Sequence, residues 1–304
     1  MDSVCKKLIV LTGPTAVGKT KFAISLAKHF DTEIVSCDSR QFYKEMSIGT
    51  AVPSSEELAA VKHHLIHHKS VVEYYNVSMF EQDALNVINT LFETKDVVVM
   101  TGGSGLYIDV IADGIAELPD ADLALREQLS LECEEKGLSF MTQKLKLLDE
   151  EYFNLVDLSN KNRVLRGLEV CLQTGQKFSE LRKNSKVKRA FDIQKICLMR
   201  DRQELYNRIN QRVDAMIEMG LLDEVRFLLP MRDYQSLNTV GYKELFEFLD
   251  GNVPFEKAIE NIKTNSRRYA KRQITWFKRD ASYRYYVLKG DDSLDAKNVI
   301  LLAS

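Results

Sequence analysis

The stretch GPTAVGKT, residues 13–20, decides the fold of this 304-residue chain. It fits the pattern GxxxxGK[ST] at every defined position, and it lies between a β-branched run, KKLIVLT, and a run with apolar residues at helical spacing, KTKFAISLAKHF. A strand, a glycine-rich loop and a helix in this order form a P-loop, whose backbone N–H groups converge on phosphate oxygens. The motif predicts a bound phosphate chain, but not whether that phosphate is cleaved, transferred or released.

Two side chains of this loop have chemical roles of their own. Lys19 adds a point charge beside the phosphate, and the Thr20 hydroxyl is the expected ligand of Mg²⁺. The other contacts come from the backbone. The predicted phosphate-binding residues are Gly13, Pro14, Thr15, Ala16, Val17, Gly18, Lys19 and Thr20.

The rest of the chain predicts an α/β fold. Further β-rich runs (EIVSCD, DVVVMTGG and DIQKICLMR) alternate with helical patterns, which is typical of a parallel sheet covered on both faces. Between residues 119 and 189 the apolar spacing is helical and no strand pattern occurs. We therefore predict a P-loop-containing parallel sheet core with C-terminal helices, formed by residues 1–118 and 190–304, and an inserted all-helical subdomain, residues 119–189.

Composition excludes several protein classes. No run of about 18 apolar residues occurs, and the N-terminal residues lack a signal-peptide pattern, so we expect a cytoplasmic protein without a membrane partner. The cysteines are odd in number and contain no CxxC pair, which predicts reduced thiols and neither a disulfide framework nor a cysteine zinc site. They are Cys5, Cys37, Cys133, Cys171 and Cys197.

Positive charge is concentrated although the net charge is only −2. The segment RKNSKVKR, residues 182–189, has five basic residues and no acidic one, and residues 263–279 have seven basic residues and no acidic one. Both segments could meet a polyanion, or could equally be solvated helix faces.

Two segments follow predicted strands at the edge where ligands of parallel sheets gather. Asp38, in SCDSRQFY, could act as a base, or it could cap a turn or helix. TGGSG, residues 101–105, would bring backbone donors and the Ser104 hydroxyl to the same edge, or it could be a plain turn.

The motifs together resemble one family. GPTAVGKT, DSRQFYKEMSIGTAVP, DRQELYNRINQRVDAMIEMGLLDEV, TVGYKEL and RRYAKRQITWF follow the motif order of the bacterial tRNA dimethylallyltransferases, also called tRNA isopentenyltransferases, from Leu8 to Phe277. The resemblance implies a Mg²⁺-dependent transfer of the dimethylallyl group from dimethylallyl diphosphate to N6 of adenine 37 in tRNA, with release of diphosphate. The P-loop would then hold a leaving group.

Three side chains are the expected catalytic residues. Asp38 would remove a proton from the attacking amine, whose lone pair is delocalised. Lys19 and Arg208 would stabilise charge on the departing diphosphate. Arg208 and Arg212 lie four residues apart on one predicted helix, so they share a face; we expect Arg208 to bind diphosphate and give Arg212 less weight.

The resemblance also implies a set of tRNA contacts. Family members commonly have threonine in place of Ser104, and Trp276 either stacks on a base or, as we favour, packs in the core. The predicted tRNA-binding residues are Asp38, Ser39, Arg40, Gln41, Ser104, Arg126, Asn162, Arg163, Val164, Leu165, Arg166, Gly241, Tyr242, Lys243, Lys271, Arg272, Gln273 and Trp276.

Other functions stay open at this point. They are a small-metabolite P-loop kinase, a prenyltransferase acting on free adenine nucleotides, and a non-catalytic RNA-binding protein. KHHLIHH, residues 62–68, would space histidines for zinc if it were helical, but no third ligand is evident and we expect no metal there. The expected partners are the tRNA anticodon stem-loop and dimethylallyl diphosphate, and we expect a monomer.

Overall fold

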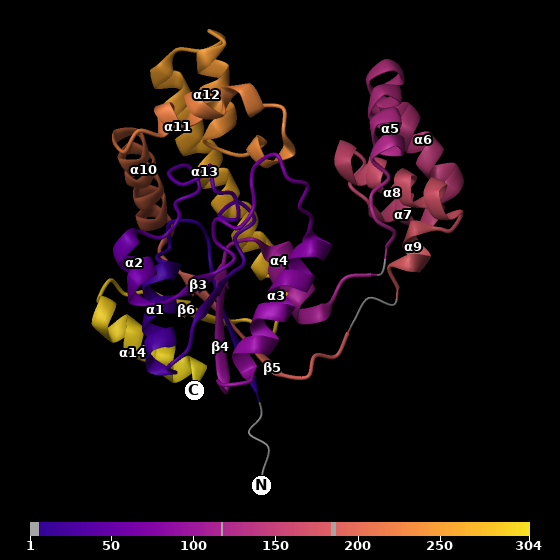
Figure 1. Ribbon diagram of the computed structural model, residues 1–304. Coiled ribbons are helices and arrows are strands. Elements are labelled where there is room, and N and C mark those ends of the chain that lie inside the picture. The colour runs from indigo at the N-terminus through magenta and orange to yellow at the C-terminus, as the bar shows by residue number, and fades with distance from the viewer. Residues whose placement is uncertain (1–5, 117, 184–186) are drawn as a thin grey trace. The chain divides into compact units, whose positions relative to one another are not determined.

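The computed structural model describes residues 6–116, 118–183 and 187–304. They form two compact units, one of residues Met1–Ala112 and Arg189–Ser304 and the other of residues Asp113–Lys188. We predicted the insertion at residues 119–189, so the second unit begins earlier than expected, at the end of a helix of the first unit. Figure 1 shows both units.

The first unit contains a six-stranded parallel sheet with the strand order β3-β2-β4-β1-β5-β6. Because all neighbours are parallel, their carboxyl ends meet at one edge, and the P-loop, Asp38 and Ser104 all follow strands at that edge. The strands are β1 (Lys7–Thr12), β2 (Ile34–Ser36), β3 (His63–His64), β4 (Val97–Gly102), β5 (Asp192–Met199) and β6 (Arg284–Val287). The predicted α/β class with a parallel sheet is confirmed.

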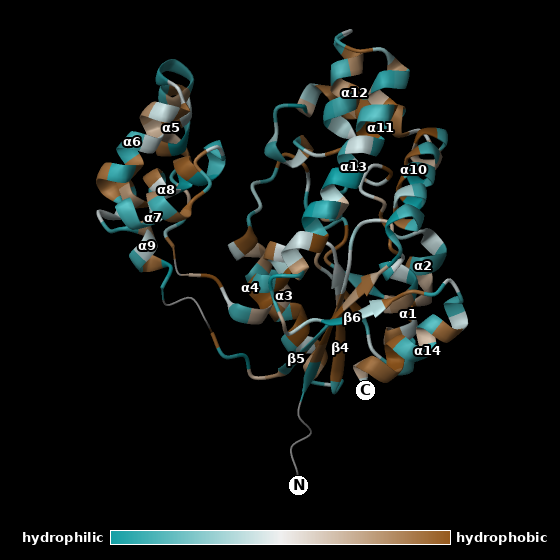
Figure 2. Cartoon of the chain, turned by 180° about the vertical axis from the view of Figure 1, so that it is seen from behind, coloured by the Kyte–Doolittle hydropathy of each residue, from teal (hydrophilic) through white to brown (hydrophobic). Residues whose placement is uncertain are grey.

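Helices cover both faces of this sheet. α1 and α14 lie on one face and α3 and α4 on the other, while α10 to α13 lie beyond the carboxyl edge (Figure 1). The central strand β4 is almost wholly hydrophobic (Figure 2), because both of its faces are buried. The helices are α1 (Lys19–His29), α2 (Ser55–Ala60), α3 (Val77–Phe92), α4 (Gly105–Asp113), α10 (Arg202–Glu218), α11 (Leu221–Leu228), α12 (Tyr242–Leu249), α13 (Phe255–Phe277) and α14 (Asp292–Ala303), with 3₁₀ turns at Leu229–Met231 and Gln235–Leu237.

All the regular secondary structure in the described part of the second unit is helical. Its helices are α5 (Leu123–Lys136), α6 (Leu138–Leu148), α7 (Glu150–Leu155), α8 (Lys161–Thr174) and α9 (Phe178–Leu181). They enclose a separate apolar core that includes Leu129, Met141 and Leu168. The fully buried carboxylate of Asp149 caps α7 by accepting from Tyr152 N at 2.9 Å, and it also accepts from the Ser179 N–H at 2.7 Å. The predicted all-helical insertion therefore has its own core.

The histidine-rich segment is not helical. His63 and His64 form strand β3, so the helical spacing needed for a zinc pair does not arise. Across the described ranges, no group of three or more His, Cys, Asp or Glu side chains could hold a metal ion. Cys37, Cys133, Cys171 and Cys197 are free and buried, and Cys5 lies outside the described residues, as do residues 184–186 of the first basic segment. No described helix is long and apolar enough to cross a membrane.

Candidate active site

The P-loop is shaped by close contact with strand β5. Gly13 has φ 148°, and a Cβ at this position would lie 2.5 Å from the Leu198 carbonyl oxygen, so a larger residue would push the loop off the sheet. Helix α1 begins at Lys19, and its N-cap residue Gly18 provides no side-chain hydrogen bond to the first turn. The N–H groups of that turn therefore have no cap and face the position where an anion binds at a helix N-terminus.

The Lys19 ammonium lies folded against its own loop. Nζ donates to the Gly13 and Pro14 carbonyl oxygens, each at 3.1 Å. Burial lowers the pKa of Lys19 to about 8; the Asp38 carboxylate opposes this shift and the Arg212 guanidinium adds to it. An anionic ligand in the cradle would favour the charged lysine.

Three arginines bind successive residues of the P-loop. Arg200, at the end of β5, donates from Nε to the Val17 carbonyl oxygen at 2.9 Å. On α10, Arg208 donates from Nε to the Ala16 carbonyl oxygen at 2.9 Å, and Arg212 donates from Nη1 to the Thr15 hydroxyl at 3.3 Å. The predicted shared face of Arg208 and Arg212 is therefore present. The sequence reasoning missed Arg200, although its place after a strand run was a usable signal.

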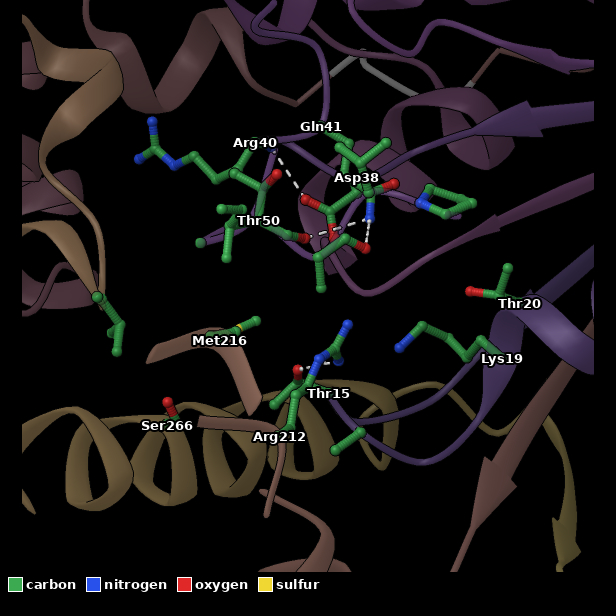
Figure 3. A pocket seen from close by; sticks show the side chains of 18 of the residues that line it. Thr15, Lys19, Thr20, Asp38, Arg40, Gln41, Thr50, Arg212, Met216 and Ser266 are labelled. Carbon is green, nitrogen blue, oxygen red and sulfur yellow. Dashed lines mark hydrogen bonds between the residues drawn. The ribbon is translucent and has the colours of Figure 1, made fainter. Parts of the chain in front are cut away.

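Arg212 lies closer to the centre of the site than we expected. Figure 3 shows its side chain and that of Lys19 directed into the space that Asp38 borders. Burial lowers the pKa of Arg212, while the Asp38 carboxylate opposes that shift. Burial and the nearby Arg200 also lower the pKa of Arg208. We gave Arg212 too little weight, because helical spacing alone does not say which arginine reaches the space between loop and carboxylate.

Asp38 caps a turn and also lines the cavity. Its Oδ1 accepts from the Arg40 N–H at 3.0 Å, which caps the turn after β2. No hydrogen bond to Oδ2 occurs among the described residues, and the side chain lines the cavity. One oxygen thus holds the turn, while the other keeps its lone pairs free of hydrogen bonds from the described residues, as a base requires.

The two residues that follow Ser39 hold neighbouring loops. The Arg40 Nη1 donates to the Ser236 carbonyl oxygen at 2.9 Å. The Gln41 Nε2 donates to the carbonyl oxygens of Thr50 at 3.3 Å and Ala51 at 3.0 Å. Both residues line the cavity.

Ser104 joins the Asp38 turn to helix α13. Its hydroxyl accepts from the Ser39 N–H and donates to the Ser39 hydroxyl, both at 3.0 Å. The Tyr269 side chain lies close enough to Ser104 to affect its ionisation, and burial, with the Asp38 charge nearby, raises the pKa of Tyr269 to about 12. We did not predict Tyr269; its position four residues before Gln273 places both on one face of α13 and was the available signal.

Two predicted tRNA contacts on α13 are used inside the protein. The buried Gln273 accepts from the Thr15 N–H through Oε1 and donates from Nε2 to the Gly103 carbonyl oxygen, both at 2.8 Å. Its carboxamide thus bridges the P-loop and the end of β4, and because Gln273 also lines the cavity, its RNA contact stays a prediction. Trp276 is half-buried and donates from Nε1 to Asp109 at 2.9 Å, which agrees with packing, whereas Lys271 and Arg272 are exposed.

Three further predicted RNA contacts are corrected because their side chains are buried. Tyr242 is fully buried and donates its hydroxyl to Glu224 Oε1 at 2.7 Å. Val164 and Leu165 belong to the apolar core of the second unit. Their periodicity places them on the inner face of an amphipathic helix.

The remaining predicted contacts differ in exposure. Asn162, Arg163 and Lys243 are exposed, and Gly241 is buried at the start of α12. Arg126 and Arg166, in the second unit, form ion pairs with the buried Glu169 at 2.8 and 3.0 Å.

Residues of the first unit line a cavity of about 1380 Å³. It is larger than the roughly 300–1,000 Å³ of sites that bind one small ligand. The P-loop forms one side and the Asp38 turn another (Figure 3), and the lining also includes apolar residues such as Ile209 and Met216. The cavity has room for a phosphate-bearing substrate and a second reactant together.

The chain is similar to proteins of one kind along most of its length. A family model described as IPP transferase matches residues 41–280. A tRNA dimethylallyltransferase of Christiangramia forsetii is 49% identical over 279 residues, which cover 92% of each chain. A tRNA dimethylallyltransferase of Bacteroides thetaiotaomicron is 49% identical and covers 92% of this chain and 91% of its own.

Solved structures agree with these relatives. The crystal structure of the full-length tRNA isopentenylpyrophosphate transferase of Bacillus halodurans superposes with a TM-score of 0.72 at 36% identity, covering 98% of this chain and 95% of that one. A eukaryotic dimethylallyltransferase acting on tRNA superposes with a TM-score of 0.82 at 26% identity, covering 97% of this chain and 78% of that one.

Proposed function

Because the chain belongs to the IPP transferase family and transfers a dimethylallyl group to tRNA, we propose that its P-loop binds the diphosphate of dimethylallyl diphosphate and that its acceptor is N6 of adenine 37, beside the anticodon. One observation carries this proposal. An anion cradle with Lys19 faces the Asp38 carboxylate across a single cavity large enough for two reactants.

The proposed reaction follows from what these groups can do. The allylic C–O bond breaks and its electron pair passes to the diphosphate, where the loop N–H groups, Lys19, Arg208 and Arg212 stabilise the new charge. The N6 lone pair forms the new C–N bond, and Asp38 takes the proton that N6 loses. Diphosphate leaves, and no phosphoryl group is transferred. Preorganised donors of this kind are worth about 3–4 kcal/mol each when they are aimed at developing charge.

The residues present fit a Mg²⁺ ion that arrives with the diphosphate. Thr20 follows Lys19 at the start of α1 and lines the cavity, so its hydroxyl oxygen lies where a P-loop ligand is needed. Mg²⁺ in such sites takes few protein ligands and completes its shell with phosphate oxygens and water, which agrees with the absence of an acidic cluster in the described part of the chain. When bound, the ion would neutralise charge on the leaving diphosphate.

The exposed basic residues support an RNA acceptor over a free nucleotide. Lys271 and Arg272 on α13 are exposed, Arg272 lines the cavity, and Arg163 is exposed on α8 of the insertion. A free nucleotide would not need these charges, whereas an anticodon stem-loop would meet them. We infer that both units contact tRNA and that the enzyme works as a cytoplasmic monomer.

The test is a transfer assay with radiolabelled dimethylallyl diphosphate and Mg²⁺. Parallel reactions contain unmodified tRNA, the same tRNA with guanine at position 37, AMP, or no acceptor. We expect label in the first reaction only. Label in AMP would support a free-nucleotide prenyltransferase, and phosphoryl transfer from ATP to a small alcohol would support a kinase. An active, folded preparation that labels none of the acceptors would refute the proposal.

A further inference from the structure

Glu224, on α11, holds a loop that is distant from it in the sequence. Its Oε2 accepts from the N–H groups of Ser47 at 2.9 Å and Ile48 at 2.8 Å. Its Oε1 accepts from the Gly49 N–H at 3.0 Å and the Tyr242 hydroxyl at 2.7 Å. Each carboxylate oxygen thus accepts two hydrogen bonds. Of the four donors, three are consecutive backbone amides and the fourth is the Tyr242 hydroxyl. Nothing in the transfer reaction as described above uses this residue.

The loop that Glu224 holds, residues 47–51, is closely fitted. A Cβ on Gly49 would lie 2.6 Å from the Tyr242 ring, so only glycine lets the loop approach that ring. The Thr50 hydroxyl donates to the Met46 carbonyl oxygen at 2.6 Å, and Ala51 has φ 51°, a conformation that costs free energy for a residue with a Cβ. The contacts around this turn therefore hold its backbone in a conformation that Ala51 would not favour by itself.

The same loop continues into the acceptor side of the site. The Thr50 and Ala51 carbonyl oxygens accept from Gln41 Nε2, and Gln41 Oε1 accepts from the Ser36 hydroxyl at 3.3 Å. The Ser36 hydroxyl in turn accepts from the Asp38 N–H at 3.4 Å. Figure 3 shows Thr50, Gln41 and Asp38 on one side of the cavity. Hydrogen bonds, joined through the backbone of residues 47–51, thus connect α11 to the turn that carries Asp38.

We propose that Glu224 is a positioning residue for the prenyl transfer. It fixes the conformation of residues 47–51, and this loop fixes the Gln41 carboxamide and the Asp38 turn against the acceptor. This inference rests on the proposed function. The carboxylate matters because it offers acceptors on both sides, whereas a glutamine would turn its NH₂ group toward a backbone N–H in either flip. One flip would lose the hydrogen bonds from Ser47 and Ile48, and the other would lose the one from Gly49.

The central test is Glu224→Gln in the full chain, with tRNA and dimethylallyl diphosphate varied separately. We expect kcat to fall about 10- to 100-fold, as for small displacements of reacting groups. The KM for dimethylallyl diphosphate should stay within about twofold, because the P-loop contacts are untouched. Hydrogen exchange at the amides of residues 47–49 should accelerate in the same variant. An unchanged kcat with an active wild-type enzyme would refute the inference and leave the proposed function intact.

The chain offers a matched control in Asp295. Its fully buried carboxylate accepts from the N–H groups of Lys289 and Gly290 and from the Tyr286 hydroxyl, so it resembles Glu224 in chemistry but does not line the cavity. We expect Asp295→Asn to lower the unfolding temperature while kcat stays within about twofold. An equal loss of kcat in both variants would show that Glu224 acts only through general stability.

A double-mutant cycle separates positioning from an independent effect. Glu224→Gln is combined with Gln41→Ala; if Glu224 acts through Gln41, the double variant should lose little more activity than Gln41→Ala alone. Additive losses would refute the proposed route. Gly49→Ala serves if Glu224→Gln does not fold, because it displaces the loop while Glu224 keeps its charge, and it should lower kcat with the same small effect on the KM for dimethylallyl diphosphate. A Gly49→Ala variant with wild-type kcat would also refute the inference.

Discussion

Lys19 shows how the environment of one residue changes its chemistry. Its ammonium lies among backbone carbonyls with a positive guanidinium nearby, and burial lowers its pKa from 10.5 to about 8. In the free protein, Lys19 is thus partly neutral just above neutral pH. An anionic ligand nearby favours the protonated lysine and so restores its positive charge. Lys19 can therefore bind a phosphate chain when it is protonated, and it loses its positive charge as the pH rises.

We therefore predict that affinity for dimethylallyl diphosphate, measured without tRNA, falls as the pH rises above about 8. Bound diphosphate raises the lysine pKa, so above pH 8 binding must take up a proton, and the affinity loss approaches about tenfold per pH unit. Phosphate esters complete their ionisation near pH 6, so the ligand charge is constant over this range. Calorimetry in two buffers should show the proton uptake. Lys19→Arg should remove the pH dependence, and a flat wild-type profile would contradict the assignment.

The same shift affects stability. Because the folded pKa of Lys19 is below its unfolded value, the unfolded chain binds more protons between about pH 8 and 10.5. The contribution of this group to stability is therefore unfavourable below pH 8 and is relieved as the pH rises through that range.

At the residue scale we also predict that Asp38→Asn abolishes most turnover. Asparagine keeps the oxygen that accepts from the Arg40 N–H, so the turn should persist while the base is lost. We expect kcat to fall about 100-fold or more, with tRNA affinity within about threefold of wild type. Single-turnover rates and filter binding measure the two effects separately. A loss of binding as large as the loss of rate would show that Asp38 is a tRNA contact and not a base.

At the scale of elements, helix α13 connects two loops that come from different strands. The Gln273 carboxamide bonds to the Thr15 N–H after β1 and to the Gly103 carbonyl oxygen at the end of β4. Tyr269, one turn earlier, lies near Ser104. One face of the helix thus organises the site, while Lys271 and Arg272 on its exposed side remain available to a polyanion.

This division predicts different effects of two substitutions on one helix. Gln273→Leu leaves a buried N–H and a buried C=O without partners, so we expect a loss of about 1–3 kcal/mol of unfolding free energy and weaker binding of dimethylallyl diphosphate. Lys271→Ala should change stability by less than about 0.5 kcal/mol and should lower tRNA affinity and its salt dependence. Denaturant titration and binding at several salt concentrations distinguish them; two variants with the same profile would contradict the division.

At the scale of the whole molecule, the two units have separate apolar cores. Asp149 joins α7 to α9 inside the helical unit, because it accepts from Tyr152 N and from both the N–H and the hydroxyl of Ser179 while fully buried. If the donors that bond to Asp149 lost their partner, the stability of the helical unit would fall, whereas the core of the sheet unit would be unchanged.

We predict that Asp149→Ala destabilises residues 113–188 on the order of 3 kcal/mol and leaves the sheet unit unchanged. Hydrogen exchange should accelerate in α6 to α9 only, and affinity for dimethylallyl diphosphate should be retained while the KM for tRNA rises. Asp157→Ala is the control, since Asp157 also accepts from the N–H and hydroxyl of one serine, Ser159, but is exposed. It should cost less than about 1 kcal/mol, and faster exchange throughout the sheet in Asp149→Ala would contradict independent cores.

Features that depend on residues close together in the chain were determined by the sequence alone. The P-loop, the parallel sheet, the helical insertion and the strand-end position of Asp38 could be predicted, because helical and strand periods and glycine-rich turns depend on neighbouring residues. Burial was only partly predictable: Val164, Leu165 and Tyr242 lie inside, although their motifs suggested RNA contacts. A motif marks a segment without telling which side chains face inward.

Only the tertiary structure decided how distant segments complete the site. Glu224 lies 177 residues beyond Ser47, and Gln273 lies 258 residues beyond Thr15, so no local pattern relates the partners. Tyr269 and Arg212 gain their roles from the packing of α13 and α10 beside the carboxyl edge of the sheet. The physical reason is that a hydrogen bond between remote residues depends on the folded path of the whole chain, whereas secondary structure depends mainly on a few neighbours.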